Sequence, residues 1–256
     1  MNIFSSIRPV RLLILAIGIT LVGCASVKPM ALDKNSKAVD VSTKSVVLMT
    51  LDIYRTEPSR YVPNPFTISF EKPNGSDKPE IQNFQLKDSD QTTSKDGHDI
   101  YLLSMALEPG QYKLNGISGD ANAFPFHGFF FVPLLMDIQI QKNAVTYIGR
   151  VKAELRPRQG NEFRAGAVVP LIDQAVTGVP TGTFDIAVED FSLEDIPYFQ
   201  STYPALSSTS ISTALLPQFE RSKAQRWWDG DTKTSMKHES TPSQSVPPIK
   251  VAEKAR

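Results

Sequence analysis

Cysteine is almost absent from this chain of 256 residues, and Cys24 is the only one. A chain with one thiol cannot form an internal disulfide, so its fold must be stabilised by an apolar core. The three histidines, His98, His127 and His238, are far apart, and none has a second histidine at metal-site spacing. The HExxH motif, the GxSxG nucleophile motif and a phosphate-binding glycine loop are also missing. The sequence therefore predicts no cofactor and no bound metal ion, and it carries no recognised catalytic motif.

An excess of one charge is lacking too, because 27 basic residues balance 27 acidic residues. Removal of residues 1–23 takes away Arg8 and Arg11, which leaves 25 basic and 27 acidic residues and a net charge of −2. A chain with this balance has no electrostatic attraction to nucleic acid or to an anionic membrane surface. We therefore expect no nucleic-acid partner.

A long hydrophobic run is the third absence. The longest uncharged apolar run, Leu12 to Val22, has 11 residues, which as a helix would cover about 16 Å. The hydrocarbon core of a bilayer is about 30 Å thick, so this run is too short to span it. Arg8 and Arg11 precede the run and small residues follow it, as in a secretory signal peptide. We therefore predict that residues 1–23 are a cleaved signal peptide, with an uncleaved anchor helix as the alternative.

The end of this segment, Leu21-Val22-Gly23-Cys24, resembles the lipobox of bacterial lipoproteins. The resemblance implies cleavage between Gly23 and Cys24 by signal peptidase II, diacylglyceryl transfer to the thiol, and acylation of the new amino group, for example with palmitate. Three acyl chains, at about 0.8 kcal/mol per buried methylene, would anchor the protein to a membrane through Cys24 without measurable release. The alternative is a buried cysteine that follows an ordinary signal peptide.

The residues after the cysteine bear on localisation. In enterobacterial lipoproteins, an aspartate directly after the lipidated cysteine retains the protein in the inner membrane. This chain has Ala25 at that position, followed by Ser26. The resemblance thus implies contact with the lipoprotein processing and sorting machinery. It also implies an outer-membrane protein that faces the periplasm, with exposure at the cell surface as a second arrangement.

Strand patterns dominate the middle of the chain. Within Val46 to Tyr54, every second residue from Val47 to Ile53 is apolar and shares one face, as in a strand. In residues 145–155, one face is apolar (Val145, Tyr147, Val151, Ala153 and Leu155) and the other is polar (Thr146, Arg150, Lys152 and Glu154). Glu108-Pro109-Gly110 is a strong turn signal. Seven to nine short strands without intervening helical patterns favour a mainly β fold, an antiparallel β-sandwich over residues 45–206. Residues 24–44 are small and polar, and we expect a lipidated N-terminus and tether there.

The chain changes character after Val188. A hydroxyl cap and an acidic first turn in Ser192 to Asp195 indicate a helix start, which Pro197 should limit to a turn or two. A second short helix is expected within residues 207–229, over Gln218 to Trp228. Residues 230–256 are rich in Ser, Thr, Lys and Pro and should form a disordered tail.

Four segments carry a family resemblance. Similar segments occur in uncharacterised bacterial lipoproteins: the turn Leu107-Glu108-Pro109-Gly110-Gln111-Tyr112, the strand Val145-Thr146-Tyr147-Ile148-Gly149, the stretch from Phe184 to Phe199, and Tyr203-Pro204-Ala205-Leu206 behind it. Those proteins have a prealbumin-like or carboxypeptidase-regulatory-like sandwich. The resemblance covers roughly residues 45–206, and it implies a fold but no activity.

Two aromatic segments are the candidate partner surface. The first is the run from Phe124 to Phe131, in which Phe129, Phe130 and Phe131 are consecutive. Its aromatic rings are suited to core packing, and the alternative is a ligand groove or a patch for a partner. The second is Trp227-Trp228, which either docks a C-terminal helix on the sandwich or contacts a partner.

These observations favour a lipid-anchored, non-catalytic binding or scaffold module that holds an envelope protein. The alternative is an envelope hydrolase with an unrecognised active site. A hydrolase would need a pocket in which His98 or His127 lies at hydrogen-bond distance from an acidic residue.

Overall fold

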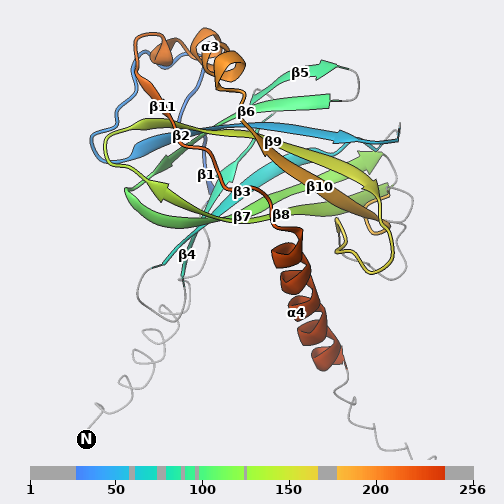
Figure 1. Ribbon diagram of the computed structural model, residues 1–256. Helices are drawn as coiled ribbons and strands as arrows, with labels where there is room; N and C mark the ends of the chain where they lie inside the picture. Colours follow the sequence, from blue (N-terminus) through green and yellow to red (C-terminus); the bar gives the residue numbers. More distant parts are fainter. Residues whose placement is uncertain are drawn as a thin grey trace, which may run out of the picture.

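The computed structural model describes residues 27–57, 61–73, 79–87, 90–95, 98–123, 126–166 and 178–239. The predicted signal peptide, Gly23, Cys24 and residues 240–256 lie outside the described residues. The described chain is mainly β and forms two sheets that face each other, so it is sandwich-like (Figure 1).

The first sheet, called sheet A, has five strands. In spatial order these are β1 (Val27–Lys28), β4 (Glu80–Gln85), β3 (Asn64–Lys72), β7 (Gly110–Ala123) and β8 (Phe126–Ile140). The second sheet, sheet B, contains β10 (Gly182–Glu189), β9 (Val145–Pro157), β2 (Ser45–Arg55), β6 (His98–Leu107) and β5 (Gln91–Lys95), with β11 (Ile211–Thr213) on β9.

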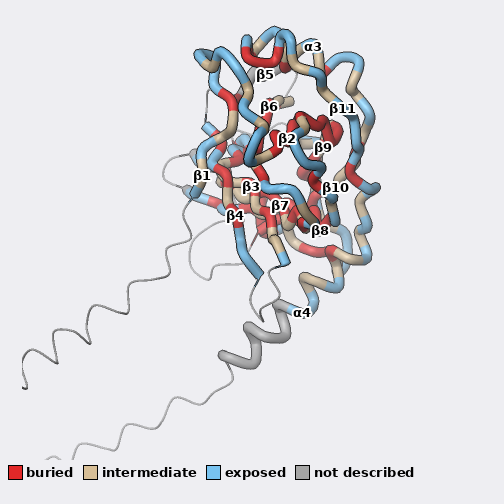
Figure 2. Tube along the Cα trace, turned by 90° about the vertical axis from the view of Figure 1, so that its left-hand side faces the viewer, coloured by how far each residue is buried: buried red, intermediate tan, exposed pale blue. Residues whose placement is uncertain are grey.

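The main core lies between the two sheets, and Figure 2 colours red the buried parts of the strands that enclose it. Val47, Met49, Leu51 and Ile53 of β2 all face it, which confirms the strand and the face predicted from their alternation. Phe70 of β3 packs edge-on against Phe84 and Tyr112 from the neighbouring strands. This core provides the stabilisation that a chain without disulfides requires.

The sheets are mixed, so the expectation of antiparallel pairing throughout is not confirmed. Of the described pairings, β2 with β9, β1 with β4 and β11 with β9 are parallel. A tight hairpin forces antiparallel pairing, as between β7 and β8. β2 and β9 are far apart in the sequence and are connected through sheet A, so no hairpin sets their relative direction. Alternation within a strand cannot reveal that direction.

The outer face of sheet B is covered by α3 (Ser192–Thr202), the short 3-10 helix η2 (Pro204–Leu206) and part of the N-terminal segment. Phe199 and Tyr203 pack there on Leu48, Leu102 and Tyr147. The predicted helix start at Ser192 and its acidic first turn are confirmed, but the predicted hydroxyl cap is wrong, because Phe191 is the N-cap and no side chain caps the helix. The helix also continues through Pro197 to Thr202. Burial of Phe199 against the sheet stabilises the turns that follow the proline.

The second helix, α4 (Arg221–Glu239), begins in the predicted region and extends ten residues past the predicted end at residue 229. It contacts β8 of sheet A and projects from the sandwich (Figure 1). Among the described residues, no helix has both the length and the apolar character needed to cross a bilayer.

The segment predicted as a tether packs on the sandwich from its fourth residue onward. Val27 and Lys28 form β1, beside β4. The backbone N–H of Ala31 donates to the Ser104 carbonyl at 2.7 Å, and that of Leu32 donates to the Ser104 hydroxyl at 3.0 Å. Leu32 is buried. Only Ala25 and Ser26 therefore separate Cys24 from the folded domain.

Candidate functional site

The aromatic run of β8 divides between the two faces of sheet A. Phe130 is 3% exposed and packs against Phe184 in the core, with 5.6 Å between ring centroids. Phe129 is 60% exposed and Phe131 is half-buried, because both point to the outer face. Of the three phenylalanines predicted as a partner surface, Phe130 therefore belongs to the core, and Phe129 and Phe131 lie on the outer face.

The two aromatic segments meet on this outer face. The Trp227 ring of α4 lies 5.3 Å from the Phe131 ring, centroid to centroid, and the two planes are inclined by 47°. Trp227 and Trp228 are both half-buried and pack against the main core. Docking of a C-terminal helix therefore accounts for both tryptophans. In addition, Trp227 forms part of the wall of a groove.

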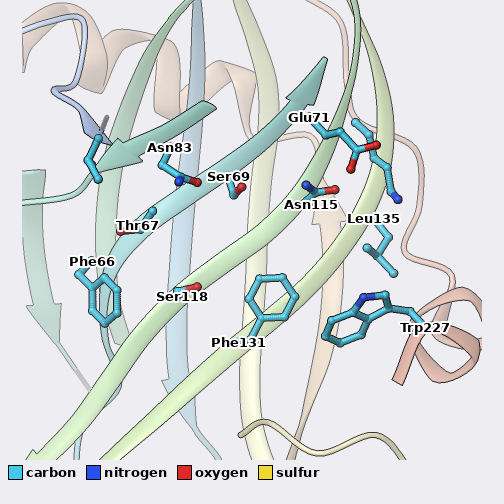
Figure 3. Close-up of a pocket in the computed structure, with 12 residues that line it drawn as sticks. Phe66, Thr67, Ser69, Glu71, Asn83, Asn115, Ser118, Phe131, Leu135 and Trp227 are labelled. Carbon is cyan, nitrogen blue, oxygen red and sulfur yellow. The ribbon is translucent and has the colours of Figure 1, made fainter. Parts of the chain in front are cut away.

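This groove, called the sheet A groove, has a volume of about 470 Å³ (Figure 3). It crosses the outer face of sheet A from β1 to α4. Its lining combines three kinds of side chain: aromatic and aliphatic groups, neutral polar groups and one residue of each charge. These are Val27, Phe66, Thr67, Ser69, Glu71, Asn83, Lys113, Asn115, Ser118, Phe131, Leu135 and Trp227.

Two strand irregularities bring the polar groups to one face. Asn115 and Ser118 of β7 are three residues apart and would point to opposite faces of a regular strand. The register shift between Leu114 and Gly116 turns Ser118 outward, and Ile117 then enters the core. A similar shift between Pro65 and Thr67 of β3 places both Phe66 and Thr67 in the groove.

Register fixes the neighbours across the strands. Thr67 of β3 is opposite Ser118 of β7, and Ser118 is opposite Phe131 of β8. Next to this row, Gly116 leaves room for the Phe131 ring, because a Cβ at Gly116 would lie 2.6 Å from that ring. In Figure 3, Ser118 lies between Phe66 and Phe131, and Trp227 lies beyond Phe131.

The neutral polar side chains of the groove are free to bind a ligand. Five of them are half-buried and make no hydrogen bond with the part of the chain that the structure describes: Thr67, Ser69, Asn83, Asn115 and Ser118. Each presents both a donor and an acceptor. The charged residues Glu71 and Lys113 are opposite each other in register, so the groove has no net charge.

One of the histidines, His98, lies beside a carboxylate. His98 Nδ1 lies 2.8 Å from Asp52 Oδ1, and the imidazole stacks on Tyr54 with ring centroids 4.0 Å apart. Burial and the nearby Glu154 carboxylate raise the pKa of the Tyr54 hydroxyl to about 12. His98 lines neither the sheet A groove nor the two smaller cavities, one beside Tyr203 and one beside Ile148.

The other histidines show no acidic partner within the described residues. His127 is exposed, and its Nδ1 lies 3.0 Å from the Asn122 side-chain oxygen. The side chain of His238 lies outside the described residues. No group of three or more acidic, histidine or cysteine side chains capable of holding a metal ion occurs in the described part of the chain.

Most polar residues of the groove were not singled out from the sequence. Thr67 and Ser69 alternate with the core residues Ile68 and Phe70 of β3, which fits their place on the outer face. Asn115 likewise follows the alternation of Tyr112 and Leu114 in β7.

Ser118 carries no such signal, because the bulge between Leu114 and Gly116 breaks the alternation before it.

Comparisons with known proteins give little help. No family model matches the chain, and no curated protein matches it significantly. A leucine-rich repeat protein from Bacteroides thetaiotaomicron matches 48% of this chain and 15% of its own length, with 12% identity and a TM-score of 0.31. A candidate cell adhesion protein from Parabacteroides distasonis matches 57% of this chain and 41% of its own length, with 13% identity and a TM-score of 0.25. At these TM-scores neither similarity supports an inference about this protein's function.

Proposed function

We propose that this protein is a lipid-anchored envelope lipoprotein that acts as a non-catalytic binding or scaffold module through the sheet A groove. Its anchor is the acylated Cys24, and its place is the outer membrane, facing the periplasm. The processing and sorting machinery for lipoproteins acts on it first, and an envelope component is its functional partner. The fold belongs, in this proposal, with the prealbumin-like or carboxypeptidase-regulatory-like sandwiches.

One observation carries this proposal: the distance along the chain from the lipidation motif to the groove. Val27 lines the groove, and Cys24 is three residues before it. Three extended residues span at most about 11 Å. A lipid on Cys24 would therefore hold the groove close to the membrane surface, where its ligand would be another component of the envelope.

The chemistry of the groove favours binding over catalysis. Hydroxyl, amide and aromatic groups line it, together with one carboxylate and one ammonium group. Such groups can hold and orient a ligand. General acid–base or nucleophilic catalysis would need a base placed beside a nucleophile, and the lining offers no histidine or cysteine for that role.

In-cell photo-crosslinking tests the proposal. A photoreactive phenylalanine analogue is placed at Phe131, in the groove, and in a matched strain at Leu193, which is 87% exposed on α3 over the other sheet. We expect a discrete adduct from position 131, identified by mass spectrometry as an envelope component, and none from position 193. Equal adducts from both positions, or none from either, would contradict a binding role for the groove.

The alternative function, an envelope hydrolase, is favoured by the 2.8 Å contact between His98 and Asp52. A carboxylate in this position orients an imidazole for use as a base. The purified chain would then hydrolyse an ester, amide or glycoside substrate, and His98→Gln would abolish the activity. Unchanged turnover in His98→Gln, or no turnover by the parent chain, would remove this alternative.

A further inference from the structure

We infer that the ligand of the sheet A groove is a neutral oligosaccharide, an inference that rests on the proposed binding function of this groove. The observation behind it is a group of polar side chains that make no hydrogen bond with the described residues, together with aromatic rings from β3, β8 and α4 in the same groove. The hydroxyl-rich edge and the apolar face of a sugar ring match these two kinds of group.

The hydrogen-bonding groups match sugar hydroxyls in kind. A sugar hydroxyl both donates and accepts, and so do the side chains of Thr67, Ser69, Asn83, Asn115 and Ser118. A ligand with only acceptors, such as a phosphate, would leave half of this capacity unused. These groups are half-buried, so water reaches them less freely than it reaches an exposed surface. A ligand that pairs with them would therefore replace a restricted hydration shell.

The aromatic rings match the apolar face of a sugar. Phe66 lies on β3, and Phe131 lies two strands away on β8, with Trp227 beside it. Strands in a sheet are spaced by about 4.8 Å, so the strands of Phe66 and Phe131 are about 10 Å apart, with Asn115 and Ser118 of β7 between them. That distance accommodates about two sugar rings, with the hydroxyls toward the polar side chains and the C–H faces toward the aromatic rings.

The two charges of the groove give no net attraction to an ionic ligand. Glu71 and Lys113 are opposite each other in register and cancel in net charge. Neither forms an ion pair within the described residues, so both charges would face a ligand. An anionic ligand would meet Glu71, and a cationic ligand would meet Lys113. A neutral chain avoids both repulsions.

The position of the groove disfavours an extended peptide. Peptides that bind to sheets usually pair with the free backbone groups of an edge strand. The groove instead lies over β3 and β7, which are paired on both sides in sheet A, so their backbone groups are already used. Recognition in the groove must therefore rely on side chains, as it does for a sugar.

Isothermal titration of the mature lipidated chain in nanodiscs tests the inference. The probes are three neutral hexasaccharides, of β-1,4-glucose, α-1,4-glucose and N-acetylglucosamine, with hexagalacturonate as the anionic comparison. We expect saturable binding of at least one neutral probe and weaker binding of hexagalacturonate. The double variant Asn115→Ala, Ser118→Ala should weaken binding by about tenfold or more, because two hydrogen-bonding groups are lost.

The matched control is Gln111→Ala, an exposed position on the same strand β7 that does not line the groove. Its affinity should stay within about twofold of the parent, and thermal melting should show that all variants remain folded. Absence of binding by all three neutral probes, equal binding by the double variant, or tighter binding of hexagalacturonate would overturn the inference.

The titration and the crosslinking experiment together separate this inference from the proposed function. A protein adduct at Phe131 without saccharide binding would refute the sugar ligand and still support a binding function for the groove. The absence of both signals would refute the two together.

Discussion

Single residues on β8 and β7 determine which aromatic rings lie on each face of sheet A. The rings of Phe130 and Phe131 point in opposite directions, and each lies against a glycine of β7. A Cβ at Gly119 would lie 2.2 Å from the Phe130 ring, and one at Gly116 would lie 2.6 Å from the Phe131 ring. These two glycines therefore seat one aromatic ring in the core and the other in the groove.

Replacement of Phe130 tests its assignment to the core. Phe130→Ala should lower the free energy of unfolding by about 3–5 kcal/mol, because it removes a buried ring and leaves a cavity beside Phe184. The control Phe129→Ala, at an exposed position on the same strand, should change it by less than about 1 kcal/mol. Urea denaturation measures both values, and equal losses would show that the strand faces are assigned wrongly.

A second residue-level feature is the ion-pair network at the start of α4. Arg156 donates to both Glu162 oxygens at 2.8 Å, and these bonds lower the pKa of the Glu162 carboxyl to about 2. Arg221, the first residue of α4, contacts Glu162 at 3.2 Å and also pairs with Asp185. The network connects the helix to β9 and β10.

The pKa of Glu162 predicts a pH-dependent contribution to stability. A carboxyl whose pKa is lowered on folding stabilises the fold above its unfolded pKa, and this stabilisation is lost as the pH falls toward the folded value. At pH 7, Glu162→Gln should cost about 2 kcal/mol. The difference from the parent should shrink between about pH 5 and pH 2. Urea titrations over this range measure it, and a difference independent of pH would contradict the prediction.

At the scale of elements, α3 is held on sheet B by one buried carboxylate. Asp195 is 1% exposed, accepts a hydrogen bond from the Tyr147 hydroxyl at 2.6 Å and pairs with Arg150. Burial and the Asp195 carboxylate raise the pKa of the Tyr147 hydroxyl. The Phe191 ring covers the Arg150 guanidinium at 4.0 Å. The helix thus supplies the carboxylate that forms an ion pair with Arg150 of β9.

Removal of the Asp195 carboxylate should lower the free energy of unfolding. Asp195→Ala leaves the Arg150 charge and the Tyr147 hydroxyl buried without their partner and should lower stability by about 3–5 kcal/mol. Its exposed neighbour offers a matched variant, Glu194→Ala, which should change stability by less than about 0.5 kcal/mol. Thermal and urea unfolding distinguish the two, and a small loss for Asp195→Ala would mean that α3 is held mainly by Phe199 and its apolar contacts.

The elements also show what the sequence could and could not predict. Alternation identified the strands β2 and β9, and an acidic first turn located the start of α3. Alternation also put Val145 and Tyr147 of β9 on the same face as Val151, which is wrong. They pack on the outer face of sheet B, because the register shifts between Tyr147 and Arg150. The bulge in β7 was not predictable, because one extra residue reverses the faces that alternation assigns. The end of α4 was also missed, since a polar sequence beyond Trp228 gives no apolar period to follow.

At the scale of the whole molecule, the sequence predicted a two-layer β fold but not its connections. The parallel pairing of β2 with β9 arises from contacts between segments about a hundred residues apart, and short-range patterns carry no information on them. The N-terminal segment was expected to be a tether because it is polar. Leu32, one of its few large apolar residues, anchors it to sheet B instead.

This packing would keep the domain close to a lipid on Cys24. If Cys24 carries the lipid, only two residues separate the bilayer from β1, so the domain cannot move far from the membrane. Insertion of twenty Gly and Ser residues after Ala25 should leave the fold intact and weaken the crosslink from Phe131 if its partner lies at the membrane surface. An unchanged crosslink yield would place the partner away from the membrane.

Mass spectrometry of the intact mature protein and of its peptides, purified from membranes, tests whether Cys24 carries the proposed lipid. The account predicts that the first residue is Cys24, with a diacylglyceryl thioether on sulfur and an acyl group on nitrogen. A mature chain that begins elsewhere, or that carries an unmodified Cys24, would contradict the lipid anchor and the membrane-side position of the groove.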